Sequence, residues 1–161
     1  MNNTHFEIER KFLIEYPDIK LLDSLEVCTR ADIIQIYTKD KIRIRKWTEN
    51  GKTTYIKTKK EKVSEITRIE TEQEIDKAEF DRLCTLADSD LRPIEKRRFR
   101  YPFKNKIIEI DIFPFWTDKA LCEVELESEN EEFSLPSFIK VIREVTFDKR
   151  YRNSALAKEI P

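Results

Sequence analysis

Apolar and polar residues alternate with a period of two along most of the chain. Successive side chains of a β-strand point to opposite faces, so this alternation predicts strands with one apolar and one polar face. It recurs in eight segments, at residues 6–14, 33–38, 42–48, 53–60, 66–76, 94–102, 107–114 and 121–128. Asn50 and Gly51 separate two of these segments, and Asn-Gly favours a tight hairpin turn. The pattern predicts a mainly β, antiparallel protein.

Helical patterns are fewer and shorter than the strand patterns. The clearest covers residues 76–90, where Asp76 can cap the first turn and Glu79 follows three residues later. Further helices are expected at residues 17–25, from Pro136 through 145, and from Ser154 through 160. The fold class expected is therefore α+β, mainly β, with a few flanking helices.

Composition narrows the class of protein. A chain of 161 residues is the usual size of one domain, so we expect residues 1–161 to form a single domain. Its 31 basic and 32 acidic residues leave a net charge of −1, which favours neither nucleic acid as a partner nor an acidic tail. No segment resembles a signal peptide or a membrane span, so no membrane partner and a cytoplasmic location are expected.

Scarce residue types exclude several kinds of site. The three cysteines show no CxxC spacing, which argues against a disulfide framework and a zinc site. Gly51 is the single glycine, so glycine-rich phosphate loops are excluded. The single histidine, His5, is interpreted as a surface or packing residue without assigned chemistry.

The charged faces of the predicted strands are sorted by sign. Basic positions that share a face are Arg43 and Arg45, Lys57 and Lys59, and Lys96, Arg98 and Arg100. Acidic positions that share a face are Glu7 and Glu9, Glu70, Glu72 and Glu74, Glu109 and Asp111, and Glu123, Glu125 and Glu127. A solvated surface usually mixes its charges, so this sorting suggests an enclosed face.

Two interpretations of this sorting stay open at this point. The sheet can be open, with a wet charged face and cross-strand ion pairs. About eight strands also tend to close into a barrel, because closure removes exposed edges. Acids on the inside would then need a divalent cation, for which oxygen ligands favour Mg²⁺ or Mn²⁺, and bases on the inside would need an anion such as a phosphate chain.

The segment FEIERKF at residues 6–12 resembles the ExExK signature of the CYTH superfamily, the triphosphate tunnel metalloenzymes. The motifs RIRK, KTKK, RIETE, IEKRR, EIDIF, EVELE and EVTFDKRYRNSALA follow in the order of that family and cover nearly the whole chain. The resemblance implies an eight-stranded antiparallel β-barrel tunnel that binds a triphosphate together with a divalent metal ion, Mg²⁺ or Mn²⁺.

The resemblance also implies roles for individual residues. The expected metal ligands are Glu7, Glu9, Glu123 and Glu125. The expected phosphate ligands are Lys11, Arg43, Arg45, Lys57, Lys59, Lys96 and Arg98. A second acidic set comprises Glu70, Glu72 and Asp111. Lys11 and Lys96 are the candidates for proton transfer, since neighbouring cations can lower the pKa of a lysine. Where relatives often carry Thr-x-Lys, Lys57-Thr58-Lys59 suggests an additional cation in the tunnel.

The activity implied is metal-dependent hydrolysis of a triphosphate, with inorganic tripolyphosphate favoured because the chain is short and shows no extra domain for a base. Thiamine triphosphate hydrolysis and class IV-type adenylate cyclase activity are the enzymatic alternatives. A module that binds polyphosphate or a nucleotide without turnover is the non-enzymatic one. The expected partner is a small-molecule triphosphate, and the oligomeric state is left open, a homodimer included.

Overall fold

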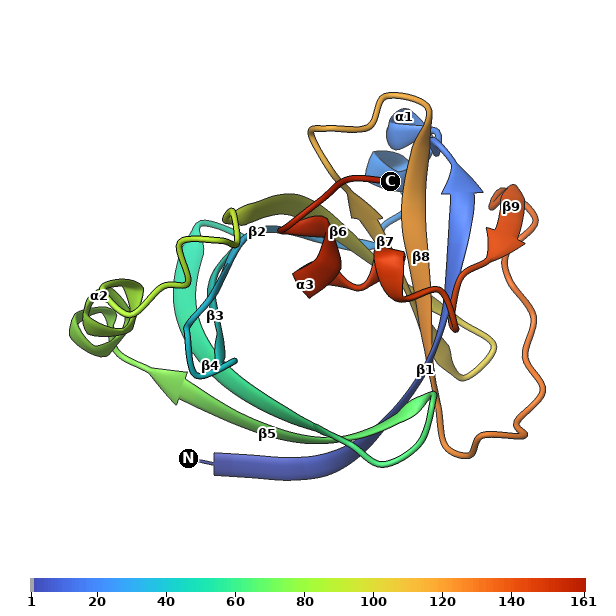
Figure 1. Ribbon diagram of the computed structural model, residues 1–161. Helices are drawn as coiled ribbons and strands as arrows, with labels where there is room; N and C mark the ends of the chain where they lie inside the picture. Colours follow the sequence, from blue (N-terminus) through green and yellow to red (C-terminus); the bar gives the residue numbers. More distant parts are fainter. Residues whose placement is uncertain (1) are drawn as a thin grey trace.

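Eight antiparallel strands form a closed barrel in the computed structural model, which describes residues 2–161 (Figure 1). The strands are β1 (Asn2–Glu15), β2 (Thr29–Tyr37), β3 (Arg43–Glu49), β4 (Lys52–Lys62), β5 (Thr67–Ile75), β6 (Ile94–Phe103), β7 (Lys106–Ile112) and β8 (Lys119–Leu126). All eight predicted strands are present. The expected α+β, mainly β class and the eight-stranded barrel are confirmed, and the open sheet is excluded.

The long strand β1 closes the barrel. The strands are ordered β5-β4-β3-β2-β6-β7-β8-β1, and an additional pairing joins β1 to β5. Residues 2–8 of β1 pair with β5, whereas residues 8–15 pair with β8 on the other edge. The first half of β1 therefore lies beside β5, and its second half lies beside β8. We call the contact between β1 and β5 the seam.

The hairpin between β3 and β4 turns at the predicted dipeptide. Asn50 and Gly51 have φ angles of 50° and 75°. Positive φ at both central residues is the requirement of the type I′ turn, whose twist matches the flanking strands. This turn fixes the pairing of the two strands, with Glu49 opposite Lys52.

The helices are shorter than the sequence predicts. They are α1 (Ile19–Ser24), α2 (Lys77–Cys84), a 3₁₀ turn (Lys149–Tyr151) and α3 (Asn153–Leu156). Asp76 caps α2 as expected, because its side chain accepts a hydrogen bond of 2.8 Å from the amide of Glu79. The helix ends at Cys84 rather than near residue 90, and beyond it the Asp88 carboxylate accepts a hydrogen bond of 2.9 Å from the amide of Asp90 and stabilises a turn.

The prediction of a helix from Pro136 through residue 145 is wrong. Residues Val141–Glu144 form a ninth strand, β9, outside the barrel. It pairs with Phe12–Ile14 of β1, whereas β5 pairs only with residues 2–8, so this part of the β1 edge is free of β5. The free edge offers backbone partners that a local helix lacks, so the tertiary pairing overrides the helical pattern.

The main apolar core lies on the outer face of the barrel, against β1, β6, β7 and β8. Its fully buried members include Ile14, Phe99, Ile108 and Val124, and α1 contributes Leu22. Each of the four strand residues alternates with a residue that points into the barrel. One face of these strands is therefore fixed by apolar packing, and the charged face is turned inward. Among residues 2–161, no helix is both long and apolar enough to span a membrane.

A second apolar cluster closes one end of the barrel. Leu13 and Leu121 continue the inward-facing rows of β1 and β8, and they pack with Tyr151 and Leu156. Residues 145–157, which we call the C-terminal cap, carry the last two of these side chains. Figure 1 shows α3 of this cap projecting across the ring of strands. The tunnel floor is therefore formed by the end of the chain.

Candidate active site

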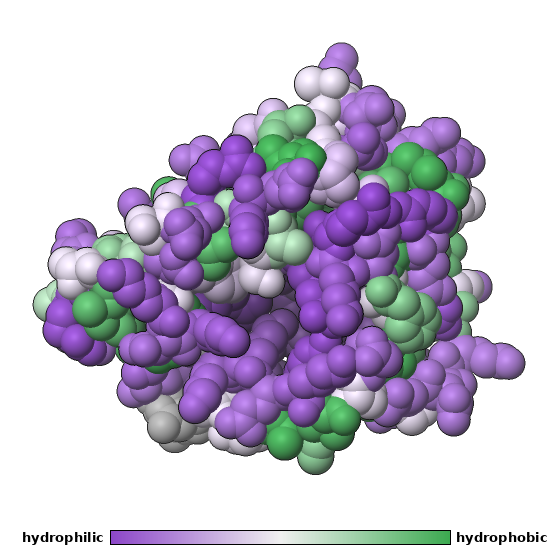
Figure 2. All heavy atoms as spheres, viewed as in Figure 1, coloured by the Kyte–Doolittle hydropathy of each residue, from purple (hydrophilic) through white to green (hydrophobic). Residues whose placement is uncertain are grey.

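A cavity of about 1110 Å³ runs through the barrel and is lined by side chains from all eight strands and from the C-terminal cap. Figure 2 shows it as a hollow bordered by hydrophilic residues. Its acidic lining residues include Glu7, Glu9, Glu70, Glu72, Glu109, Glu123 and Glu125. Its basic ones include Lys11, Arg43, Arg45, Lys60, Arg68, Lys96, Arg98, Arg100 and Arg152. The sorted charges do face an enclosed space.

The predicted positions of Lys57 and Lys59 in the tunnel are wrong. Neither residue lines the cavity, whereas Thr58 and Lys60 do. In the β3–β4 pairing Thr58 lies directly opposite Arg43, so these two share the inner face. The chain therefore carries Thr-x-Lys after all, as Thr58-Lys59-Lys60, and the lysines that β4 contributes to the cavity lining are Lys60 and Lys62 instead of Lys57 and Lys59.

The position of the hairpin turn in the sequence identifies which face of β4 points into the tunnel. A two-residue turn at Asn50 and Gly51 pairs Glu49 with Lys52, and counting outward from there places Arg43 opposite Thr58. Directly opposed residues point to the same side of the sheet. Counting from the turn would have assigned Lys60, two residues beyond Thr58, to the tunnel.

The two lysines make a matched test of this register. Replacing Lys60 with methionine is expected to raise KM about tenfold or more for the triphosphate substrate that the resemblance implies, since it removes one charge-assisted contact to phosphate. Replacing Lys59, which is exposed and outside the tunnel, is expected to change KM less than about twofold. Steady-state kinetics of both variants give the comparison. Equal effects would contradict the inward placement of Lys60.

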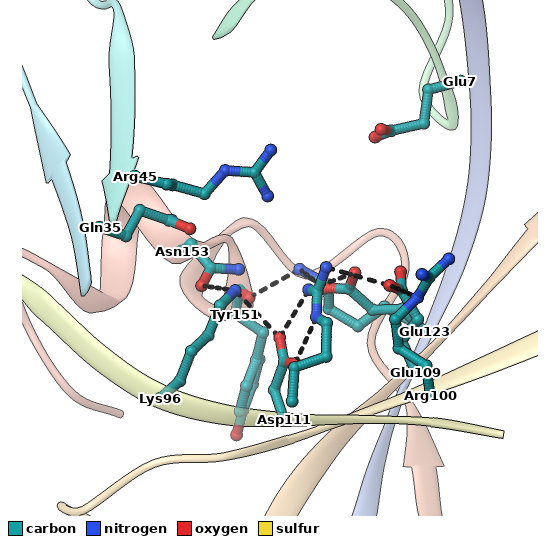
Figure 3. A network of polar contacts seen from close by, with 12 residues as sticks. Glu7, Gln35, Arg45, Lys96, Arg100, Glu109, Asp111, Glu123, Tyr151 and Asn153 are labelled. Atoms are coloured by element: carbon teal, nitrogen blue, oxygen red, sulfur yellow. Dashed lines mark hydrogen bonds and ion pairs between the residues drawn. The ribbon is translucent and has the colours of Figure 1, made fainter. Parts of the chain in front are cut away.

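Asp111 is completely buried and orients two predicted phosphate ligands (Figure 3). Arg98 donates two hydrogen bonds to it, at 2.7 and 2.9 Å, and the ammonium of Lys96 lies 3.0 Å from it. Asp111 does not line the cavity. Its position behind the two cations indicates that it holds them in place, so the structure does not group it with Glu70 and Glu72.

The C-terminal cap supplies partners for both candidate proton-transfer lysines. Lys96 donates a hydrogen bond of 3.1 Å to the side-chain oxygen of Asn153, and Lys11 donates one of 3.2 Å to the backbone carbonyl of Tyr151. The Lys11 ammonium also lies 3.2 Å from Glu123. Sequence reasoning missed Asn153. The cap thus fixes both ammonium groups at the closed end of the tunnel.

The enclosed environment changes the ionisation of the tunnel groups. Burial lowers the pKa of Lys96 to about 8, even though Asp111 opposes the shift. Burial and the neighbouring Arg43 lower the pKa of Arg45 to about 10. Burial alone would raise the pKa of Glu123, but Lys11 and Arg98 hold it well below the usual range. Burial therefore makes the charges of Lys96 and Arg45 costly, and an anion in the cavity would offset that cost.

The acidic side is short of positive charge. Glu9 lies directly opposite Glu125 in the β1–β8 pairing, and like charges in that position repel. Burial and repulsion from Glu123 raise the pKa of Glu9 well above its ordinary value. Within residues 2–161 neither Glu9 nor Glu125 makes a side-chain hydrogen bond or an ion pair, whereas Glu7 is paired with Lys60. A divalent cation between the carboxylates fits this charge deficit.

The arginines of β3 face the acidic strand β5. Arg45 donates a hydrogen bond of 2.6 Å to Glu72, and Arg43 lies 3.8 Å from Glu70. Both glutamates therefore neutralise predicted phosphate ligands in the absence of an anion. This arrangement could bind a phosphate chain between β3, β4 and β6, and the carboxylates of β1 and β8 could hold a divalent cation.

Comparisons with known proteins agree with this geometry. The model of the CYTH domain matches residues 5–154. The chain is 34% identical over 155 residues to an inorganic triphosphatase of Acetivibrio thermocellus, covering 94% of this chain and 93% of that protein. It is also 34% identical over 164 residues to an inorganic triphosphatase of Nitrosomonas europaea, covering 96% of this chain and 99% of that protein.

A solved structure of the inorganic triphosphatase NE1496 superimposes with a TM-score of 0.57 at 30% identity, covering 96% of both chains. The PH1012 protein of Pyrococcus horikoshii shares the fold at a TM-score of 0.51 and 18% identity, covering 76% of this chain and 80% of its own. The family model and the two triphosphatase relatives extend over nearly the whole chain. This chain belongs to the CYTH domain family.

Proposed function

We propose that this protein hydrolyses inorganic tripolyphosphate to pyrophosphate and phosphate, with Mg²⁺ or Mn²⁺ as its cofactor. The observation that carries the proposal is the separation of charge within one cavity. Unpaired carboxylates on β1 and β8 face cations on β3, β4 and β6. Binding an anion alone would not require the opposed pair of Glu9 and Glu125. The two relatives named inorganic triphosphatase support the choice of substrate.

The residues that would hold the metal ion are Glu7, Glu9, Glu123 and Glu125. A divalent ion bound there supplies positive charge to the phosphate oxygens and lowers the pKa of bound water. Glu9 and Glu125 are ready to accept it, whereas Glu7 and Glu123 would exchange their lysine partners for it. The ammonium groups of Lys60 and Lys11 line the same cavity beside these carboxylates and would contact phosphate oxygens.

The basic residues orient the phosphate chain. Arg43 and Arg45 present guanidinium groups, which match phosphate oxygens in pairs and neutralise the charge that moves in the transition state. Arg98 is held by Asp111 and donates a further hydrogen bond of 3.1 Å to Glu109, which lines the cavity. Together these contacts keep the terminal phosphoanhydride in line for attack by water.

Lys96 is the group we assign to proton transfer. With a pKa of about 8 it is partly neutral near physiological pH, so it can accept a proton from the attacking water. Asp111 and Asn153 fix its ammonium nitrogen from two sides. Lys11 has a raised pKa, because Glu123 and Glu9 outweigh the effect of burial, and it serves as a charge rather than as a base.

The test is a panel of tripolyphosphate, thiamine triphosphate and ATP, each with Mg²⁺, Mn²⁺ or EDTA. We expect rapid phosphate release from tripolyphosphate with either metal, slow release from the other two, and none with EDTA. Cyclic AMP and pyrophosphate from ATP would replace the proposal with a cyclase. A preference for thiamine triphosphate would change the substrate, and tripolyphosphate binding without turnover would leave a binding module.

A further inference from the structure

The seam of the barrel holds a cluster that the proposed reaction does not use as a unit. His5 on β1 lies directly opposite Glu70 on β5, and Glu7 follows on the same face of β1. Ligand atoms of these three side chains all lie within 4.8 Å of one another. His5 is the single histidine of the chain. The cluster combines one ring nitrogen with two carboxylates.

Two buried atoms of this cluster receive no hydrogen bond. The side chain of Glu70 is only 5% exposed, and its Oε2 atom receives no hydrogen bond. The Nδ1 atom of His5 is also buried without a hydrogen-bond partner. Buried polar atoms are normally satisfied, so the ring nitrogen of His5, which has neither a hydrogen bond nor an ion pair, indicates a missing partner. No described side chain supplies a hydrogen bond to either atom.

A cation already lies at the cluster. The ammonium nitrogen of Lys60 is 2.8 Å from Glu7 and 3.3 Å from Oε2 of Glu70. Lys60 thus shows that the two carboxylates accept a positive charge between them. The Lys60 side chain is flexible and one third exposed, so a metal ion can displace its ammonium group from the two carboxylates.

We propose that His5, Glu7 and Glu70 form a second metal site that selects a transition-metal ion such as Zn²⁺ or Co²⁺ over Mg²⁺. Imidazole nitrogen binds these ions well, whereas Mg²⁺ prefers oxygen ligands and gives up its water reluctantly. Three protein ligands leave a coordination position for water or a phosphate oxygen. The site shares Glu7 with the proposed magnesium ligands, and it differs from them by its nitrogen ligand and by Glu70.

The unique histidine makes binding directly observable. The full chain without a polyhistidine tag is stripped with EDTA, saturated with Mg²⁺ and titrated with Zn²⁺, while NMR follows the imidazole nitrogen signals. We expect one equivalent of Zn²⁺ to shift these signals far more than Mg²⁺ alone does, because only zinc is expected to bind the ring nitrogen. His5 lines the cavity and Cys28 and Cys84 do not, so a shift of the imidazole signals distinguishes zinc at the proposed site from zinc bound to either cysteine.

Three variants make the test specific. Glu70→Gln is expected to weaken zinc binding about tenfold or more, because it removes one ligand. Lys60→Met is expected to tighten zinc binding, since it removes the competing ammonium. Glu74→Gln, on the same strand but exposed and outside the tunnel, is the control and should leave the affinity unchanged. Circular dichroism confirms that each variant is folded.

The proposal is overturned if Zn²⁺ leaves the imidazole signals unshifted under saturating Mg²⁺, or if Glu70→Gln binds zinc as tightly as the wild type. Either result would assign His5 to packing alone. The outcome is independent of the proposed function, because Mg²⁺-dependent phosphate release from tripolyphosphate is measured separately in protein free of transition metals. One measurement can fail while the other succeeds.

Discussion

Replacing Glu9 with glutamine is expected to lower kcat/KM for tripolyphosphate about 10²- to 10³-fold while making the metal-free protein more stable. The loss follows from removing a charge that would hold the metal ion. The gain in stability follows from the raised pKa of Glu9, because burial and Glu123 make its ionised form unfavourable in the folded state. An ordinary structural carboxylate would lose stability on the same substitution.

The sign of the stability effect depends on pH in a defined way. A carboxyl group whose pKa is raised by folding costs stability at every pH above its unfolded value, near 4.5, and costs nothing below it. The melting temperature of Glu9→Gln in EDTA should therefore exceed that of the wild type at pH 7. The two melting temperatures should converge as the pH falls below about 4.5.

The exposed Glu74 on β5 provides the control for Glu9. Glu74→Gln should change neither kcat/KM nor the melting temperature, since this side chain lies outside the tunnel. Adding Mg²⁺ should raise the melting temperature of the wild type more than that of Glu9→Gln, because only the wild type keeps its full ligand set. A destabilised Glu9→Gln with an undiminished response to Mg²⁺ would remove Glu9 from the metal site.

The strands could be predicted from the sequence because each has two chemically different faces. In β7, Ile108 and Ile110 pack in the core. On the opposite face Glu109 lines the tunnel, and Asp111 holds the tunnel residue Lys96. β9 could not be predicted in this way. It is four residues long and exists because β1 extends past β5 and leaves a free edge, a condition that no local pattern contains.

The limits of the site prediction have equally local causes. In β4 both faces are polar, since Lys57 and Lys59 alternate with Thr58 and Lys60, so alternation cannot identify the inner one. Only the register of the hairpin does. The carbonyl of Tyr151 that receives the Lys11 hydrogen bond is a backbone group, which every residue possesses, and its position depends on how the cap packs. Such contributions carry no residue-type signal.

Replacing Lys96 with methionine is expected to lower kcat for tripolyphosphate at least about 10²-fold and to stabilise the protein at neutral pH. The first effect is the loss of a positioned base. The second follows from burial, which lowers the pKa of Lys96 from 10.5 to about 8. A shift of this size corresponds to a cost of up to about 3 kcal/mol for carrying the charge in the folded state.

The pH dependence of stability tests the buried lysine apart from catalysis. Folding lowers the pKa of this base, so its cost is complete below pH 8, declines between pH 8 and 10.5, and vanishes above that range. Urea unfolding should show Lys96→Met more stable than the wild type at pH 7.5, with the difference shrinking by pH 10. A constant difference across this range would mean that the methionine acts through packing alone.

The pH profile of the reaction separates a base from a phosphate ligand. In the wild type, kcat/KM should rise through pH 8, because this parameter reports ionisation in the free enzyme and a base acts in its neutral form. The rise should be absent from Lys96→Met and retained in Arg97→Met, whose side chain lies on the exposed face of the same strand. If Lys96→Met raises KM but keeps the turnover rate and the rise at pH 8, then Lys96 binds phosphate and the proton goes to another group. Asp111 and Asn153 would in that case orient the Lys96 ammonium group toward phosphate. The same two contacts fix the side-chain nitrogen of Lys96 whether it accepts a proton or binds a phosphate oxygen.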